Sequence, residues 1–176
     1  MKSVLWISCY LLLLLPACKA YASPVNFDQL TCLTPARIAE VRRSPSLSIE
    51  KAFSACRKEL GNKVATLGLT EKQTQLAFVS ILAHSMAPYG PSTVVKLAEL
   101  LKEPVLDCDN YAILTGHFAR ILVGKKIDLN FVGFDGGLIG NHAQIFADVD
   151  GTRLLLDPTI GLIARISFDE TLAGKK

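Results

Sequence analysis

The sequence predicts a domain of the α+β class, in which helices precede a group of strands. Between residues 35 and 123, apolar side chains recur at the spacing of a helix face, whereas residues 127–156 hold apolar or alternating runs of strand length. The pair Asp150-Gly151 separates two of these runs and is typical of a two-residue hairpin turn. Half of the 176 residues are hydrophobic and a fifth are charged, a composition that fits one compact domain over residues 23–176.

Residues 1–22 have the pattern of a secretory signal peptide. Lys2 gives a basic start, residues 4–15 form an apolar run, and Ala20-Tyr21-Ala22 places small residues before a cleavage site. A membrane-spanning helix needs about 20 apolar residues, and Pro16 interrupts this run too early. We therefore expect cleavage after Ala22 and a periplasmic or secreted protein.

A second interpretation of the same segment leaves the protein attached to a membrane. Residues 15–18, Leu-Pro-Ala-Cys, resemble a lipoprotein box in which Cys18 would become the lipidated first residue. The proline before Ala17 fits this box poorly. Cleavage after Ala22 is therefore the preferred interpretation, and both interpretations predict export.

The charge of the mature chain argues against nucleic-acid binding. The sequence has 19 Lys and Arg residues and 16 Asp and Glu residues, and two of the lysines lie in the first 22 residues. Removal of that segment leaves a nearly neutral chain. Such a chain lacks the basic excess that binds phosphate backbones.

Five helices are expected from apolar periodicity, capping residues and helix breakers. Thr34, Thr70 and Asp107 cap the first, third and fifth of them, whereas Gly61 and Pro104 end the second and fourth. The expected ranges are 35–43, 48–61, 70–86, 92–103 and 108–123.

Three strands are expected after Lys126, at residues 127–134, 142–149 and 152–156. The glycine-rich residues 133–140 lack the order and the lysine of a phosphate-binding loop, and they predict a mobile connection between the first two strands. A two-residue turn at Asp150-Gly151 would place Asp157 opposite Gln144 and diagonal to His142.

Removal of residues 1–22 leaves three cysteines, Cys32, Cys56 and Cys108, in an oxidising compartment. One thiol must then remain unpaired. Cys32 and Cys56 lie 24 residues apart in a helical region, and a disulfide there typically contributes about 3 kcal/mol of stability. We expect that disulfide, and with it a free Cys108.

Cys108, His142 and Asp157 form the candidate catalytic set. Cys108 falls in the first turn of a helix capped by Asp107, where backbone N–H groups and the helix dipole favour a thiolate and can bind an oxyanion. Asp157 and His142 project from one face of the predicted hairpin, so the carboxylate can orient the imidazole. His142 can then accept the Cys108 proton.

Structural roles for these residues stay open. Cys108 can be a buried inert thiol, His142 a strand histidine, and Asp157 a turn residue before Pro158. The other two histidines, His84 and His117, lie within helical patterns and receive no role.

Three short motifs, LDCDNYA, NHAQIFADVDG and LLLDPTIG, follow one another in the second half of the chain. With them the sequence resembles the transglutaminase-like superfamily over about residues 76–165. The resemblance implies the fold of papain-like cysteine proteases, with a nucleophile helix packed on an antiparallel sheet behind a helical N-terminal half. It implies Cys108 as nucleophile, His142 as base and acid, and Asp157 as the orienting group.

The chain departs from this family at two points. Many relatives have a tryptophan after His-Ala, where this chain has Gln144. We expect Gln144 to be a surface amide on an edge strand, and the alternative is a place in the cleft opposite Asp157. The family often adds an upstream side chain to the oxyanion site, for which Tyr89 and Gln75 are the candidates.

The sequence therefore predicts an exported transglutaminase-like cysteine hydrolase or acyl transferase that acts on an amide bond through a Cys108 thioester. The alternative is a catalytically inactive transglutaminase-like binding module of the cell envelope. The expected substrate is a peptide, a protein or a cell-wall amide. Nucleic acid is not an expected partner. A membrane is an expected partner only if Cys18 is lipidated, and no cofactor or metal is implied.

Overall fold

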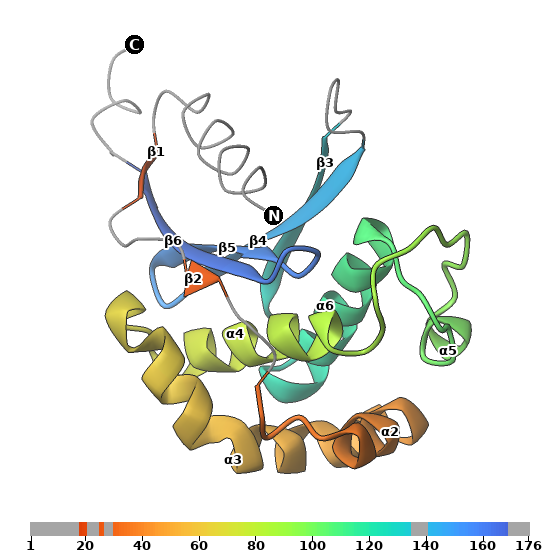
Figure 1. The fold of residues 1–176 in the computed structure, drawn as a ribbon. Coiled ribbons are helices and arrows are strands. Elements are labelled where there is room, and N and C mark those ends of the chain that lie inside the picture. The colour runs from red at the N-terminus through yellow and green to blue at the C-terminus, as the bar shows by residue number, and fades with distance from the viewer. Residues whose placement is uncertain (1–17, 21–24, 27–29, 135–140, 169–176) are drawn as a thin grey trace, which may run out of the picture.

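The computed structural model describes residues 18–20, 25–26, 30–134 and 141–168. The helices gather beneath one antiparallel sheet, so that helices form one layer and strands the other (Figure 1). The predicted α+β class is confirmed. The apolar run at residues 4–15 and the cleavage site expected after Ala22 lie outside the described residues, as do residues 135–140 of the glycine-rich connection.

The helical layer follows the predicted order of elements. Its members are α2 (Pro35–Arg43), α3 (Pro45–Val64), the 3₁₀ turn η1 (Ala65–Leu67), α4 (Glu71–His84), α5 (Leu97–Leu100) and α6 (Cys108–Leu122). Thr34, Thr70 and Asp107 cap α2, α4 and α6 with their side-chain oxygens, as the sequence predicts.

α3 differs from its prediction at both ends. It begins at Pro45 rather than at Ser48, because proline is favoured in the first helical turn, where its missing N–H costs no hydrogen bond. It continues past Gly61, because the burial of Leu60 and Val64 stabilises the helix on both sides of that glycine.

The helix predicted to open at Ser92 is reduced to the single turn α5. The Ser92 hydroxyl accepts a hydrogen bond from the N–H of Val94, and the Val94 carbonyl accepts one from the side chain of Asn110. These contacts use backbone groups that a helix would need. Val95 is 68 % exposed, so the expected apolar helix face does not form at this point.

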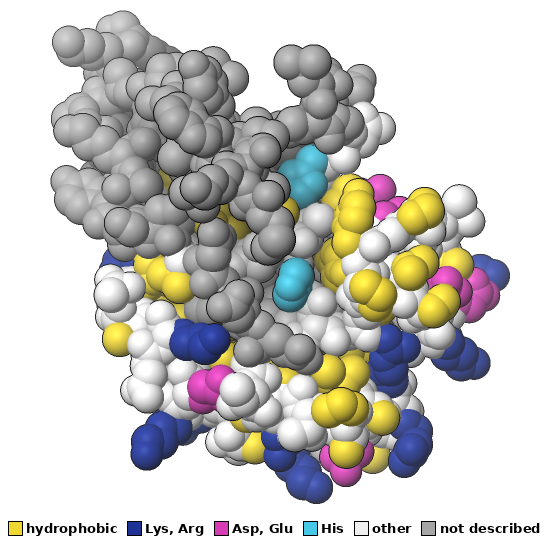
Figure 2. Space-filling model, viewed as in Figure 1, with side chains coloured by type: hydrophobic (Ala, Val, Ile, Leu, Met, Phe, Trp, Pro, Cys, Tyr) yellow, Lys and Arg dark blue, Asp and Glu magenta, His cyan; other side chains and the backbone are white. Residues whose placement is uncertain are grey.

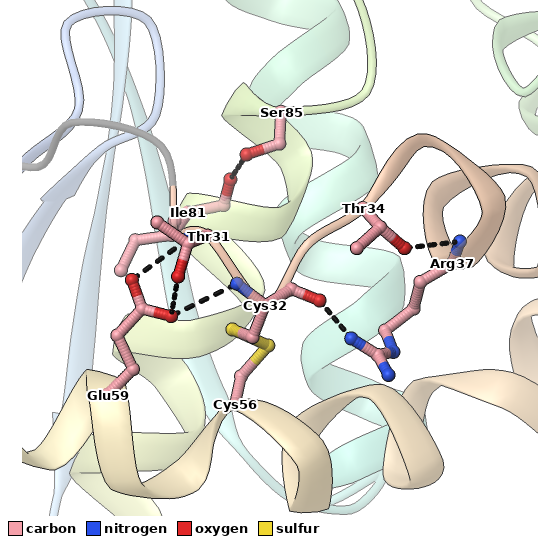
Figure 3. The surroundings of a disulfide bond; sticks show 8 residues. All are labelled: Thr31, Cys32, Thr34, Arg37, Cys56, Glu59, Ile81 and Ser85. Carbon is pink, nitrogen blue, oxygen red and sulfur yellow. Dashed lines mark hydrogen bonds between the residues drawn. A yellow bond between two sulfur atoms is a disulfide. The ribbon is translucent and has the colours of Figure 1, made fainter.

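Cys32 and Cys56 form the predicted disulfide, which ties the segment before α2 to α3 (Figure 3). Beside the disulfide, the Glu59 carboxylate accepts hydrogen bonds from the N–H groups of Thr31 and Cys32, at 2.8 and 3.0 Å. The bond from the Thr31 N–H is the main reason that the pKa of Glu59 is lowered. The segment is therefore held to α3 covalently and by hydrogen bonds.

The sheet consists of β3 (Asp128–Phe134), β4 (His142–Val149), β5 (Thr152–Asp157) and β6 (Leu162–Phe168), with the short strands β1 (Cys18–Ala20) and β2 (Val25–Asn26) paired to β6. The first three strands agree with prediction. The sequence does not predict β6, because Ile163 packs in the main core while Leu162 and Ala164 pack on the opposite face. A strand that is buried on both faces lacks the alternation that identifies strands.

The β4–β5 hairpin has the predicted turn and register. Asp150 and Gly151 form its two-residue turn with φ values of 50° and 72°, the positive values that a tight hairpin turn requires. Ile145 pairs with Leu156 at the far end of the ladder.

Both faces of the sheet carry apolar side chains. Ile145, Leu154 and Leu156 belong to the main core, which includes the helices. The second cluster, on the face away from the helices, contains Phe146, Leu155, Leu162, Ala164 and Ile166. Because side chains alternate along a strand, His142 and Gln144 leave β4 on the same side, where both reach Asp157 of β5.

Candidate active site

Cys108 is the first residue of α6, as the sequence predicts. The Asp107 carboxylate accepts a hydrogen bond from the N–H of Asn110, and the Asn110 side chain accepts one from the N–H of Asp107. This reciprocal cap fixes where the helix begins. The first N–H groups of a helix have no partner within it, so the start of α6 presents donors beside the sulfur.

The helix start is joined to the segment before it. The N–H of Gly90 donates to the Leu106 carbonyl at 3.0 Å, and the N–H of Leu106 donates to the Pro88 carbonyl at 3.1 Å. The Tyr111 hydroxyl donates to the Ala87 carbonyl at 2.6 Å, and burial raises the pKa of this tyrosine to about 12. These bonds hold the segment around Tyr89 beside Cys108.

A groove of about 500 Å³ opens between this segment and the start of α6. Its lining consists of Tyr89, Pro91, Ser92, Thr93, Asp107, Cys108, Asp109 and Asn141. Tyr89, one of the two candidate oxyanion donors, is thus beside the thiol, whereas Gln75 on α4 is not part of the lining. In Figure 2, hydrophobic side chains gather on the α5 side of the molecule, while Lys and Arg are spread over the helical layer.

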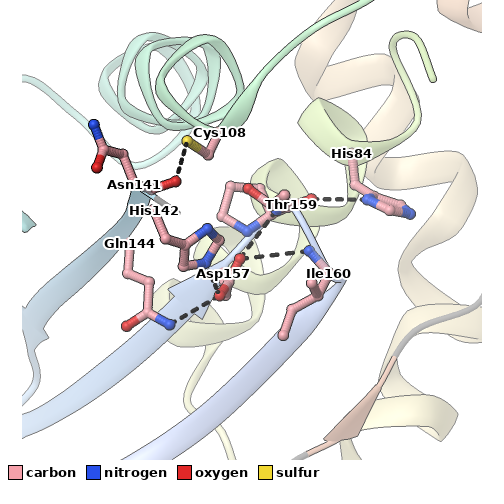
Figure 4. Close-up of polar contacts among 9 residues, drawn as sticks. His84, Cys108, Asn141, His142, Gln144, Asp157, Thr159 and Ile160 are labelled. Atoms are coloured by element: carbon pink, nitrogen blue, oxygen red, sulfur yellow. Dashed lines mark hydrogen bonds and ion pairs between the residues drawn. The ribbon is translucent and has the colours of Figure 1, made fainter. Parts of the chain in front are cut away.

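His142 and Asp157 come together at the open end of the β4–β5 hairpin. The Nε2 atom of His142 lies 2.7 Å from Oδ2 of Asp157. Asp157 is completely buried, and the His142 side chain is 18 % exposed. Because a carboxylate only accepts hydrogen bonds, Nε2 carries the proton, and Nδ1 is left free to accept one. In Figure 4 the ring lies between Asp157 and Cys108.

The Asp157 carboxylate has further donors. Its Oδ1 atom accepts the N–H groups of Thr159 and Ile160, at 3.1 and 3.4 Å, within the turn that follows β5. Its Oδ2 atom accepts Nε2 of Gln144 at 2.9 Å, in addition to His142. The buried carboxylate is therefore compensated by hydrogen bonds and serves as more than a turn residue.

The expectation that Gln144 is a surface amide is wrong. Its side chain is 6 % exposed and is bonded to Asp157, and β4 lies between β3 and β5 rather than at the edge of the sheet. The predicted hairpin register already places Gln144 opposite Asp157. That register could have indicated its role, because it brings the amide within reach of the carboxylate.

His84 is a second residue near the site to which the sequence gives no role. Its Nδ1 atom lies 2.7 Å from the carbonyl oxygen of Pro158, the residue after Asp157 (Figure 4). A carbonyl only accepts, so Nδ1 of His84 donates. This bond connects α4 to the turn that carries Asp157.

The Cys108 thiol is close to β4 but is not bonded to the imidazole. It is 8 % exposed, and Sγ donates to the Asn141 carbonyl at 3.8 Å. Among the interactions of the described residues, no hydrogen bond joins Sγ to His142. The structure therefore brings His142 and Asp157 into contact and places Cys108, which lines the groove, near the imidazole ring (Figure 4).

The electrostatic surroundings do not favour a resting thiolate. The pKa of Cys108 is raised, mainly by burial and also by the carboxylates of Asp109 and Asp107, and the N–H of Ala143 offsets only part of this rise. The sequence expectation of a thiolate stabilised by the helix start is thus contradicted. Burial disfavours the charged sulfur, and the two adjacent acids add to this effect.

The pKa of His142 is also raised. The hydrogen bond to Asp157 is the largest cause, and the charges of Asp157 and Asp109 add to it, while burial acts in the opposite direction. At rest the pair is therefore a neutral thiol beside an imidazole with increased proton affinity.

The described residues contain no group of three or more His, Cys, Asp or Glu side chains that could hold a metal ion. Within the same part of the chain, no helix is long and apolar enough to cross a membrane. Comparison with protein-family models, with curated proteins and with solved structures found no match.

Proposed function

We propose that the protein is an exported cysteine hydrolase or acyl transferase of the transglutaminase-like type, which acts on amide bonds through a thioester on Cys108. One observation carries the proposal. The contact between His142 and Asp157 engages Nε2 and leaves Nδ1 clear of the carboxylate, and Cys108 lies beside this pair at the start of a helix that borders a groove.

The first chemical step follows from these positions. His142 accepts the S–H proton on Nδ1 while the sulfur forms a bond to the carbonyl carbon of the substrate. The N–H groups of the first turn of α6 are placed to bind the resulting oxyanion. His142 then protonates the departing amine, the C–N bond breaks, and the acyl group remains on the sulfur as a thioester.

Asp157 keeps the imidazole in the productive state during this step. Its bond to Nε2 fixes the tautomer in which Nδ1 can accept a proton, and its negative charge stabilises the imidazolium that forms. Water or a second amine then attacks the thioester, with His142 acting again as base. The products are a free acid in hydrolysis and a new amide in transfer.

The raised pKa of Cys108 favours one version of this mechanism. Because the resting sulfur is protonated, His142 removes the proton as the sulfur attacks, instead of starting from a thiolate–imidazolium pair. The Cys108 side chain must also leave the Asn141 carbonyl to reach the substrate. Substrate binding in the groove can supply this displacement.

The arrangement of the chain supports the family-level part of the proposal. A helix that begins with the nucleophile packs on an antiparallel sheet, and neighbouring strands of that sheet hold the histidine and the aspartate. This is the order of elements that the transglutaminase-like motifs imply.

A second candidate function is a catalytically inactive binding module of the cell envelope. The observation in its favour is the state of Cys108, which is nearly buried, is bonded to a backbone carbonyl and has a raised pKa. In that function the groove binds a peptide or glycan without reaction. A Cys108→Ala variant would then retain the full biological activity.

The proposal is tested with p-nitrophenyl acetate, an activated acyl donor that needs no specific substrate. We expect release of p-nitrophenolate and one hydroxylamine-sensitive acetyl group on Cys108, detected by intact-protein mass spectrometry. Cys108→Ala should abolish this product, and His142→Ala should slow its formation by about 10²- to 10⁴-fold. His117→Ala is the matched control and should react like the unmodified protein.

Acetylation no faster than that of a cysteine peptide, and equally fast in His142→Ala, would contradict the proposal and favour the binding module. Where acylation is observed, purified cell wall and unfolded proteins can then be compared as natural substrates by measuring the release of amine from each.

A further inference from the structure

We propose that Gln144 is a positioning residue of this site, which holds the Asp157 carboxylate and shares with His142 the oxygen that orients the imidazole. The proposal rests on the function given above and adds a fourth member to the Cys108–His142–Asp157 set.

The contacts of Gln144 converge on one atom. Its Nε2 atom donates to Oδ2 of Asp157 at 2.9 Å, and the same oxygen receives Nε2 of His142 at 2.7 Å. Gln144 and His142 are two residues apart on β4, so both side chains leave the same face of the strand. Figure 4 shows both side chains directed at Asp157.

The chemistry of the two groups fixes the orientation of the amide. An ionised carboxylate has no proton to donate, so Gln144 must present its NH₂ group rather than its carbonyl oxygen. Gln144 is 6 % exposed and Asp157 is completely buried, so little water reaches the contact. Loss of this hydrogen bond would leave the buried carboxylate with one donor fewer, which costs stability.

Sharing the oxygen changes its interaction with the imidazole. A hydrogen bond from the amide withdraws charge from Oδ2, and the carboxylate then attracts an imidazolium less strongly. Gln144 therefore restrains the proton affinity of His142, which Asp157 raises. A base that binds its proton less tightly returns it more readily to the leaving amine.

The neighbours of His142 define what else acts on this proton affinity. The titratable groups that face the ring are Asp157 of β5 and, from α6, Cys108 and Asp109. Gln144 is uncharged and is not part of the groove lining, so it acts through Asp157 and does not touch the substrate.

The test is a pH titration of the three histidine Cε1–H signals by NMR in the full chain. Gln144→Met keeps the length of the side chain and removes the donor. We expect the pKa of His142 to rise by a fraction of a pH unit, because the lost hydrogen bond is to Asp157 and acts on the imidazole only through the charge of the shared oxygen; a whole hydrogen bond to a charged group is worth about one to two pH units. The titration of His117, which has no hydrogen bond to Asp157 or Gln144 in the described part of the chain, should be the same in both proteins and serves as the internal reference.

Asn130→Leu is the matched control, because Asn130 also donates to a carboxylate, that of Asp128, but at an exposed position on β3. It should leave the His142 titration unchanged. A His142 pKa that stays the same or falls in Gln144→Met overturns the proposal. If that variant does not fold, Gln144→Asn, whose shorter amide cannot reach Asp157, must show the same rise.

The titration does not require catalysis, so it separates this proposal from the proposed function. A rise in the pKa of His142 without any acetylation of Cys108 in the unmodified protein would retain the role of Gln144 and refute the enzyme. Where acetylation occurs, the acid limb of its pH profile should move upward with the titration in Gln144→Met.

Discussion

Replacing Asp157 by asparagine tests the central contact of the site at constant side-chain volume. The asparagine carbonyl can still accept the N–H groups of Thr159 and Ile160. Its NH₂ group then replaces Oδ2 and meets two other donors, Nε2 of His142 and Nε2 of Gln144. The imidazole can relieve this conflict only by moving its proton to Nδ1, which removes the base from the side of Cys108.

The size of the effect follows from the causes of the His142 shift. The two largest contributions that raise the pKa of His142 are its hydrogen bond to Asp157 and the charge of Asp157, and burial lowers it. The substitution removes both and leaves the burial. A hydrogen bond to a charged group is worth about 1.5 to 3 kcal/mol, so the pKa of His142 should fall by about one to two pH units.

NMR titration of the His142 Cε1–H signal measures this change, with His117 as the reference. The acetylation rate of Cys108 should fall by about 10²- to 10⁴-fold in the same variant, because the base is in the wrong tautomer. An unchanged or increased pKa of His142 in Asp157→Asn would refute the assignment of Asp157 as the orienting group.

Three further predictions concern the thiol, its acidic neighbour, and the stability of the helical layer. Because the pKa of Cys108 is raised, alkylation by iodoacetamide should accelerate at a higher pH than in the same chain unfolded in urea; acceleration at a lower pH would contradict the resting thiol. Asp109→Asn should lower the pKa of both Cys108 and His142 by a small amount, because the charge of Asp109 raises both. Since Asp109 is exposed, this change should become smaller in high salt. A change that salt does not affect would exclude a charge effect through solvent. Loss of the disulfide in Cys32→Ala with Cys56→Ala should lower the free energy of unfolding by about 3 kcal/mol, measured by urea denaturation at a pH where the fold is otherwise intact, and an unchanged unfolding midpoint would contradict it.

The pH dependence of folding has a defined sign for His142. Its pKa is raised in the folded protein, so its contribution to stability is complete below the pKa of the unfolded chain and is lost as the pH rises through the folded value. In Asp157→Asn this contribution should disappear. A comparison of urea midpoints across that pH range for the two proteins measures the difference.

Local sequence signals were sufficient for the elements that hold the site. The cap at Asp107 predicts the start of α6 at Cys108, and the turn residues Asp150 and Gly151 predict the register that pairs Ile145 with Leu156. Both signals act over a few residues, so they survive in almost any tertiary context.

The remaining features depend on contacts between distant segments. The helix expected to begin at Ser92 is reduced to a single turn, because the side chain of Asn110 donates to the carbonyl of Val94, sixteen residues before it in the chain. Gln144 is buried, and its amide is bonded to Asp157, thirteen residues away on β5. The pKa of Cys108 is raised mainly by burial, which depends on how α6 packs on β4. Periodicity along the sequence does not indicate which distant segments come into contact.

The tight β4–β5 turn brings the histidine and the aspartate together within the sheet itself. His142 and Asp157 are only 15 residues apart and belong to one hairpin, so they can assemble early and at a small cost in loop entropy. The sulfur belongs to another element, α6, and its hydrogen-bond partner Asn141, just before β4, is 33 residues away in the chain. A substitution in the helical layer can therefore displace Cys108 and abolish activity while His142 and Asp157 stay in contact. An inactive variant in which the His142 titration is unchanged would identify this case.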